Sequence, residues 1–315
     1  MAPEVGRLTV FQRTPNLCLS MNQKKLDSYA ETEERKKGCH DWIYKRRREI
    51  FAGFHFDFSE KSGDDDTAEQ KKAFFEELWS AGSFGFWLAT YKDVLFNKTV
   101  NDTAYEFWAE KTGARINDSK KKDILAPLLK DQPHTFGTKR PSLEQRYYEV
   151  FNQDNVEVIA LKQNPIEIFT ECGIKMTNGD EYGFDVIILA TGFDSVTGGL
   201  CQIDIKGTDG ILLRDKWAKS TRTYLGMATT NFPNMFFVYG PQSPGAFANG
   251  PTLVELQGDW VIDAIDYCTK NNKKTMDATA ASEAEWANHV AEIFNSTLFP
   301  ATNSWYNGYD VSANP

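Results

Sequence analysis

Val186-Ile-Ile-Leu-Ala190 is an uninterrupted apolar run of strand length. A strand that is apolar at every position is typical of a strand covered on both faces. Residues 234–239, Asn-Met-Phe-Phe-Val-Tyr, form a second run of this kind. Residues 8–12 predict a further strand, and Pro15 ends it because proline lacks the amide that a strand ladder needs. Buried strands separated by helical stretches indicate an α/β fold.

The stretch from about residue 22 to residue 129 is polar and aromatic with helical spacing, which predicts an all-helical insertion. Thr67-Ala-Glu-Gln70 is a capping box that opens one helix. Asp102 is expected to cap a second helix, which Gly113 stops. The remaining expected elements are strands at 156–161, 166–170 and 174–176, a tight turn at 177–180, and helices at 255–267 and 281–294.

Composition excludes several classes of protein. The net charge of −9 disfavours binding to nucleic acid, and 41% hydrophobic residues support a packed core. No apolar run approaches the roughly 20 residues that span a bilayer, and the first residues lack the apolar core of a secretion signal. The 5 cysteines form no C-x-x-C pair and the 4 histidines are dispersed, so we expect reduced thiols, a cytoplasmic protein and no metal site.

Two pairs of residues could bind a dinucleotide. Arg13 and Thr14 directly follow the strand at 8–12, and ligands of dinucleotide-binding sheets lie beyond the carboxyl ends of strands. A guanidinium there can fork onto a 2′-phosphate, while the hydroxyl donates one further bond. Lys139 and Arg140 lie in a loop that Pro141 closes. Taken alone, either pair is more often an ordinary turn or a basic surface pair.

Three segments, taken together, are more specific. Val10-Phe-Gln-Arg-Thr-Pro15, Phe136-Gly-Thr-Lys-Arg-Pro141 and Ala190-Thr-Gly-Phe-Asp194 occur in this order. They resemble segments of the Baeyer–Villiger monooxygenases, class B flavin monooxygenases that use FAD, NADPH and O2 to insert oxygen beside a ketone carbonyl. The resemblance runs through nearly the whole chain and corresponds to the C-terminal two-thirds of such a protein. It implies conversion of a ketone to an ester or lactone, and secondary-metabolite tailoring lies within the range of the family.

The resemblance also implies a domain organisation. It predicts parts of two Rossmann-like dinucleotide-binding domains with an all-helical insertion. Residues 1–21 and 130–189 would be the remainder of the NADP-binding domain, and residues 22–129 the helical insertion. Residues 190–315 would be the C-terminal part of the FAD-binding domain, with the substrate and control loops.

Roles for single residues follow from the same resemblance. Arg140 is the expected catalytic residue, because a permanently charged guanidinium can stabilise an anionic flavin-derived oxidant and the negative adduct that it forms with the ketone. Arg13, Thr14 and Lys139 are expected to bind NADP.

Two loops near the C-terminus complete the expected site. The loop Gly240-Pro-Gln-Ser-Pro244 resembles the one that lines the substrate pocket, which places Gln242, Ser243 and Pro244 beside the ketone. The segment 304–308 resembles a mobile loop whose tryptophan, Trp305 here, folds over bound NADP. Trp87 and Trp108 are expected in the helical core.

The chain also departs from the family pattern. It contains no G-x-G-x-x-G, the glycine loop that brings backbone amides to a dinucleotide pyrophosphate, and it lacks the F-x-G-x-x-x-H family fingerprint. The strands at 8–12 and 186–190 would then need another chain to cover their edges. Two alternatives therefore stay open: a truncated non-catalytic remnant or partner-dependent subunit, and a flavin monooxygenase that oxidises nitrogen or sulfur. The Ala190–Asp194 segment and the basic pair of Lys139 and Arg140 favour ketone oxidation over the latter.

Overall fold

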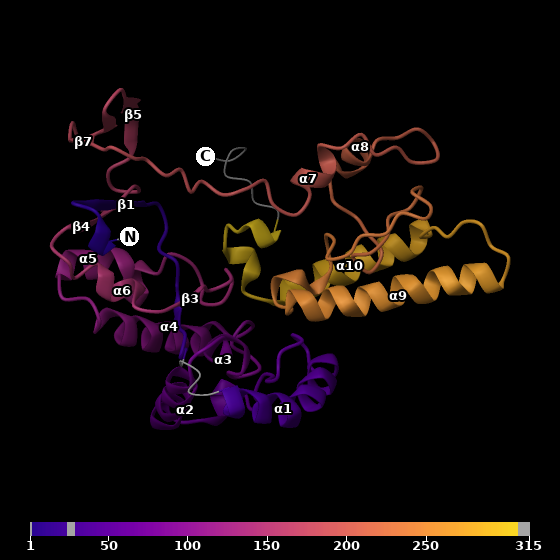
Figure 1. The fold of residues 1–315 in the computed structure, drawn as a ribbon, viewed down its shortest axis with the longest axis horizontal. Helices are drawn as coiled ribbons and strands as arrows, with labels where there is room; N and C mark the ends of the chain where they lie inside the picture. The colour runs from indigo at the N-terminus through magenta and orange to yellow at the C-terminus, as the bar shows by residue number, and fades with distance from the viewer. Residues whose placement is uncertain (1, 24–28, 308–315) are drawn as a thin grey trace. The chain divides into compact units, whose positions relative to one another are not determined.

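The computed structural model describes residues 2–23 and 29–307 (Figure 1). These residues belong to two compact units, the first made of residues 1–23 and 60–192 and the second of residues 24–59 and 193–315. The stretch 22–129, predicted as one insertion, is therefore divided between the two units. Most of its described residues are helical, whereas the predicted domains, including the insertion, stay predictions.

The first unit contains a pair of parallel strands, β1 (Leu8–Gln12) and β4 (Val156–Ala160). Their register aligns Leu8 with Val156 and Gln12 with Ala160, so both strands end at the same edge. A shorter parallel pair joins β2 (Leu19–Ser20) to β3 (Leu143–Glu144). The strands predicted at 8–12 and 156–161 are thus confirmed.

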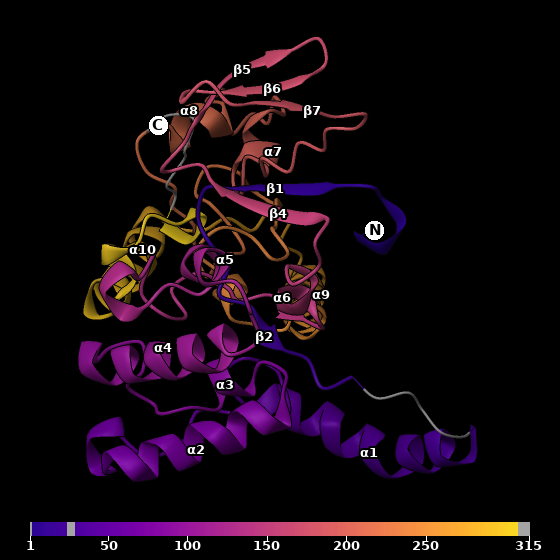
Figure 2. The same ribbon diagram turned by 90° about the vertical axis from the view of Figure 1, so that its left-hand side faces the viewer.

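An antiparallel sheet of three strands lies beside this pair (Figure 2). Its strands are β5 (Ile166–Thr170), β6 (Gly173–Met176) and β7 (Glu181–Gly183). Gly179, with φ of 92°, makes the predicted turn before β7. Ile174 and Met176 pack with Ile159 of β4, and Phe11 of β1 packs against this cluster. The small sheet therefore covers one face of the parallel pair.

The helices of the first unit begin at capping residues. Helix α2 (Ala68–Ala81) has the predicted capping box at Thr67 and Gln70. Helix α4 (Lys98–Gly113) ends at Gly113 as predicted, but its cap is Asn97, whose side chain accepts bonds from the next turn. Asp102 is not a cap, because it lies inside the helix and pairs with Lys98 one turn earlier. The other helices are α3 (Gly85–Leu88), α5 (Ser119–Leu125), α6 (Tyr147–Val150), and the 3-10 turns η1 (Ala2–Glu4), η2 (Gly63–Asp65) and η3 (Leu129–Asp131).

Aromatic side chains form the core of this helical part. Trp87 and Trp108 are fully buried, as the sequence predicts. Phe86 packs edge-on against Phe75 and Phe136, with ring centres 5.5 Å and 5.4 Å apart. Edge-to-face pairs at this spacing are favourable beyond the burial of their area. Phe136 opens the loop that carries Lys139 and Arg140, so this core directly supports the candidate site.

Long helices dominate the second unit. They are α1 (Tyr29–Glu49), α9 (Gly250–Lys270) and α10 (Ala280–Ser296), with α7 (Gly198–Cys201), α8 (Leu213–Trp217), and the 3-10 turns η4 (Pro244–Ala246), η5 (Phe299–Ala301) and η6 (Trp305–Asn307). Helices α9 and α10 confirm the predictions at 255–267 and 281–294. Helix α9 begins five residues earlier than predicted, because Asn249 caps it and Pro251 is compatible with its first turn.

Two predicted strands are absent from the structure. Residues 186–190 are irregular, and Val186, Ile188 and Leu189 are 74%, 69% and 68% exposed. Residues 234–239 are also irregular, and Asn234 and Tyr239 have positive φ. A strand apolar on both faces needs neighbouring strands for its backbone hydrogen bonds and layers for its side chains. Within the described residues no strand pairs with either segment, so neither adopts the predicted conformation.

Candidate functional site

The loop 136–141 is fixed at its start by one buried side chain. Asn101, on α4, is completely buried. Its amide nitrogen donates to the carbonyl oxygens of Val94 (2.8 Å) and Phe136 (2.9 Å), and its oxygen accepts from the Phe136 amide (3.0 Å). The Phe136 backbone is therefore held from both sides by the same residue.

The middle of the loop is equally constrained. Gly137 has a φ of 76°, and a Cβ there would lie 2.8 Å from the indole nitrogen of Trp87. That indole nitrogen donates to the Gly137 carbonyl at 3.2 Å. The Thr138 hydroxyl, fully buried, donates to the carbonyl of Thr135 at 2.7 Å. Only glycine fits at position 137 without strain, so the backbone conformation of the loop depends on this residue.

Lys139 and Arg140 follow this constrained part of the loop, and their side chains are half-buried. The Arg140 guanidinium carbon lies 5.5 Å from the centre of the Phe84 ring, a cation–π contact, and no described residue forms a hydrogen bond with the guanidinium. In the described part of the chain, neither residue forms an ion pair with a carboxylate. Burial lowers the pKa of Lys139, and the charges of Arg13 and Lys162 lower it further.

Arg13 and Thr14 follow β1 at the edge where β4 also ends. The amide of Leu161 donates to the Gln12 carbonyl at 2.8 Å, which ties the two strand ends together. Arg13 is exposed, and its charge acts on Lys139. The charges of Arg13 and Lys139 therefore act on each other, although the two residues are 126 positions apart in the chain (139 − 13).

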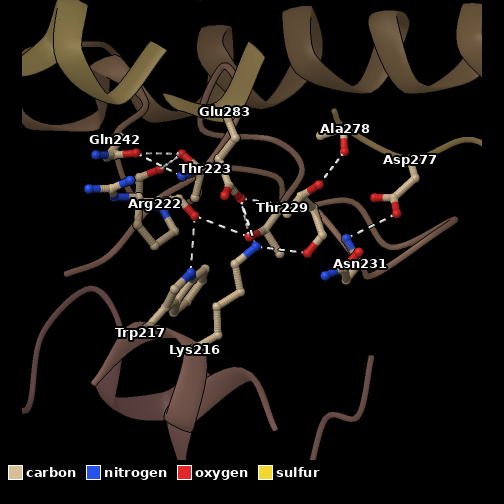
Figure 3. A network of polar contacts seen from close by, with 12 residues as sticks. Lys216, Trp217, Arg222, Thr223, Thr229, Asn231, Gln242, Asp277, Ala278 and Glu283 are labelled. Carbon is tan, nitrogen blue, oxygen red and sulfur yellow. Dashed lines mark hydrogen bonds and ion pairs between the residues drawn. The ribbon is translucent and has the colours of Figure 1, made fainter. Parts of the chain in front are cut away.

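The loop 240–244 belongs to the second unit, where Gln242 lies beside Thr223 (Figure 3). The Gln242 side-chain oxygen accepts from the amide of Thr223 at 2.8 Å and from its hydroxyl at 3.0 Å. The Gln242 carbonyl accepts from the indole of Trp286 on α10 at 3.3 Å. The side chain of Gln242 is therefore occupied inside the protein. Ser243 packs against Gly226, where a Cβ would meet it at 2.5 Å.

A buried ion pair anchors the same helix to the segment before this loop (Figure 3). Glu283 of α10 accepts from Lys216 (2.9 Å), from the Thr229 hydroxyl (2.7 Å) and from the Thr230 amide (2.9 Å). Because every donor is supplied by α8 or by residues 229–230, the network fixes α10 relative to the chain that leads into the loop. A buried carboxylate is tolerated when it is paired and hydrogen-bonded in this way.

Trp305 lies in η6 of the second unit and is 48% exposed. Its ring centre is 4.2 Å from that of Tyr306, in an edge-on contact. Gly308, which ends the expected control loop, lies outside the described residues. The role of Trp305 toward NADP stays a prediction.

The described residues contain no group of three or more His, Cys, Asp or Glu side chains that could hold a metal ion. Among the helices of the same residues, none combines the length and apolar character that crossing a membrane requires.

Known proteins resemble this chain closely in sequence and in fold. Cyclopentanone 1,2-monooxygenase of Comamonas sp. is 46% identical over 310 residues, which are 98% of this chain and 56% of the relative. The FAD-binding monooxygenase VdtE of Byssochlamys spectabilis is 42% identical over 99% of this chain and 54% of its own length. The crystal structure of OTEMO in complex with FAD and NADP superposes with a TM-score of 0.91 at 35% identity, covering 96% of this chain and 56% of that one. No protein-family model matches the chain.

Over the part of them that it spans, the chain is a homologue of the Baeyer–Villiger monooxygenases. Its α/β fold, with parts of Rossmann-like dinucleotide-binding domains, is that of solved members of the family. The chain spans about half the length of the curated relatives that it matches, 56% in the case of the Comamonas protein.

The structure shows two groups of residues that fix the candidate loops and that the sequence did not indicate. Asn101 fixes the loop 136–141, which carries Arg140. Glu283 and Trp286 fix the loop 240–244. The sequence could have indicated Asn101, because asparagine is unfavourable inside a helix unless its side chain has a hydrogen-bond partner. Glu283 gave none, because a single glutamate in the first turn of a helix is ordinary.

Proposed function

We propose that this chain carries the NADP-phosphate site and the active-site arginine of a Baeyer–Villiger monooxygenase that uses FAD, NADPH and O2 to convert a ketone into an ester or lactone. The observation that carries the proposal is the rigid loop 136–141, which presents Arg140 without a carboxylate partner among the described residues. The relatives include a cyclopentanone 1,2-monooxygenase and an acetone monooxygenase that forms methyl acetate.

The basic residues fit part of the NADP cofactor. Arg13 and Lys139 offer two cations for the 2′-phosphate, and Thr14 lies beside them at the strand end. FAD fits less well, because the sequence contains no glycine loop that would bring backbone amides to its pyrophosphate.

Arg140 has a defined task in this reaction. Flavin, when bound, supplies the activation of O2. Oxygen insertion places negative charge on the ketone oxygen, and the Arg140 guanidinium stabilises that charge without ever losing its own proton. Its position is set before the reaction, since Asn101 and Trp87 already fix the loop backbone. Preorganised charge of this kind needs no rearrangement in the transition state.

Gln242, Ser243 and Pro244 are proposed to line the ketone site. The Gln242 side chain is engaged by Thr223, which supports a role in shaping the loop. Trp305 is proposed to cover the nicotinamide cofactor, and its exposed ring is available for that contact.

The exposed apolar residues 186–189 are proposed to pair with a further polypeptide segment. Val186, Ile188 and Leu189 are largely exposed, although an apolar segment of this kind is typical of a buried strand. We propose that a β–α–β segment carrying the FAD glycine loop pairs with residues 186–189.

The test uses the enzyme assembled from this chain and a segment that supplies the FAD loop. Arg140→Ala should lower ester or lactone formation on the order of 100- to 1,000-fold, while flavin reduction by NADPH continues. Stopped-flow absorbance follows reduction, and gas chromatography with a cyclic ketone and a thioether follows products. Arg146→Ala, which removes an exposed arginine of the same unit, is the control. Normal ester yield in Arg140→Ala, or a sulfoxide as the main product, would refute the proposal.

A further inference from the structure

Two adjacent parallel strands end in basic residues. Strands β1 and β4 are in register to their last residues, Gln12 and Ala160. The Leu161 amide donates to the Gln12 carbonyl at 2.8 Å, so the two backbone segments are still hydrogen-bonded at the end of the strand pair. Arg13 is the next residue after β1, and Lys162 is the second residue after β4. Both therefore lie at the carboxyl edge of the pair, where dinucleotides bind in sheets of this type.

Lys139, in the loop 136–141, interacts with the charges at this edge. After burial, the charges of Arg13 and Lys162 are the causes that lower the pKa of Lys139. The neighbouring His134 has its pKa lowered to about 4, chiefly by burial and also by Lys139 and Lys162. His134 is therefore neutral near pH 7, and the positive potential at this edge comes from the other three side chains.

This concentration of positive charge is not neutralised by the protein. Within the described residues none of Arg13, Lys139 and Lys162 pairs with a carboxylate, although the chain has a net charge of −9. Arg7, at the opposite end of β1, does pair, with Glu157 at 2.6 Å. Three like charges near one another cost free energy unless an anion joins them.

We propose that Lys162 is the third cation of the NADPH 2′-phosphate site, which it forms together with Arg13 and Lys139. The inference rests on the proposed function, and it assigns a cofactor-selecting role to a residue outside the three recognised segments. Arg13 can fork onto two phosphate oxygens, while the lysines act as compact point charges. A phosphate dianion joined by three cations is neutralised and held from the ends of two strands and one loop.

The ordinary alternative is that Lys162 is a solvated surface lysine. The two readings predict different effects of the same substitution. If Lys162 belongs to the cluster, removing its charge relieves repulsion in the free protein and weakens phosphate binding. A solvated lysine would change neither the binding of phosphate nor the thermal midpoint.

The experiment measures binding to the full chain, in the oligomeric state in which it purifies. Isothermal titration calorimetry compares adenosine 2′,5′-bisphosphate with ADP, which lacks the 2′-phosphate. For Lys162→Met we expect the Kd for the bisphosphate to rise about 10-fold, the loss of one charge-assisted bond, with the Kd for ADP unchanged. The thermal midpoint without ligand should rise, because a repulsive charge is removed. Lys120→Met, which removes another exposed lysine of the same unit, is the matched control and should change neither.

The outcomes separate this inference from the proposed function. If Arg13→Ala weakens binding of the bisphosphate and Lys162→Met does not, Lys162 is not part of the site and the proposed function stands. If neither substitution matters, both the inference and the NADP site are wrong. Nuclear magnetic resonance gives a second readout, because a bound dianion should raise the pKa of His134. The pKa of His134 should also rise in Lys162→Met without ligand, and an unchanged value would contradict the cluster.

Discussion

At the scale of single residues, the proposed chemistry depends on basic side chains that form no ion pair with a carboxylate of the described residues. Arg140, Lys139 and Arg13 have no carboxylate partner in the described structure, whereas Arg115 forks onto both Glu144 and Glu149 at 2.7 Å. Arg115 is thereby committed to holding β3 and α6 together. Unpaired cations on rigid backbone are the ones that remain available for an anionic ligand.

At this scale Arg13→Ala tests cofactor choice. In the assembled enzyme we expect the KM for NADPH to rise roughly 10- to 150-fold, since a charge-assisted bond to phosphate contributes about 1.5–3 kcal/mol. The KM for NADH should change little, because NADH has no 2′-phosphate. Steady-state kinetics with both nucleotides checks this, and an equal rise for both would remove Arg13 from the phosphate site.

Elements place these residues. Helix α4 supplies Asn101 and α3 supplies Trp87, and together they fix the backbone of the loop 136–141. In the second unit α10 supplies Glu283 and Trp286, which tie the loop at 240–244 to α8. Helices α3, α4 and α10 thus set the geometry of the two candidate loops.

Asn101→Ala tests this function of α4. The substitution removes three hydrogen bonds in a buried site and should lower the free energy of unfolding by roughly 3 kcal/mol. Thr103→Ala is the control, since its half-buried hydroxyl bonds only within its own helix. Urea denaturation measures stability, and hydrogen exchange should show faster exchange of the Phe136 amide. Protection of that amide equal to wild type would show that other contacts hold the loop.

At the scale of the whole molecule, the chain carries exposed apolar segments. Val186, Ile188 and Leu189 are exposed in the first unit, and on α9 of the second unit Ile262 and Ile265 are more than half exposed. Surfaces of this kind mark contacts with other polypeptide or lead to aggregation. They agree with the absence of a G-x-G-x-x-G from the sequence, because the segment that would carry it is also the proposed cover.

This leads to a prediction for the chain by itself. Residues 1–315 expressed alone should not retain stoichiometric FAD and should show no NADPH-dependent oxygenation of a cyclic ketone. They should also aggregate or self-associate. A flavin absorbance scan, an oxygen electrode and light scattering measure the three properties. A yellow, monomeric and active preparation would contradict the need for a second segment.

The sequence alone determined the elements whose signals are local. The capping box at Thr67, the end of α4 at Gly113 and the strands at 8–12 and 156–160 need only neighbouring residues, and all are present. The loop 136–141 and its basic pair were also evident, through the resemblance of one contiguous segment. Local hydrogen bonds and side-chain periodicity act over a few residues, so sequence patterns report them directly.

Only the tertiary structure decided the rest. The apolar runs at 186–190 and 234–239 are not strands, because a strand needs partners that its own residues cannot supply. Asn97 rather than Asp102 caps α4, since Asp102 pairs with Lys98 within the helix. The action of the Arg13 and Lys162 charges on Lys139 depends on strand register and a distant loop. Contacts between residues more than a hundred positions apart leave no local pattern, and they arise only when the chain has folded.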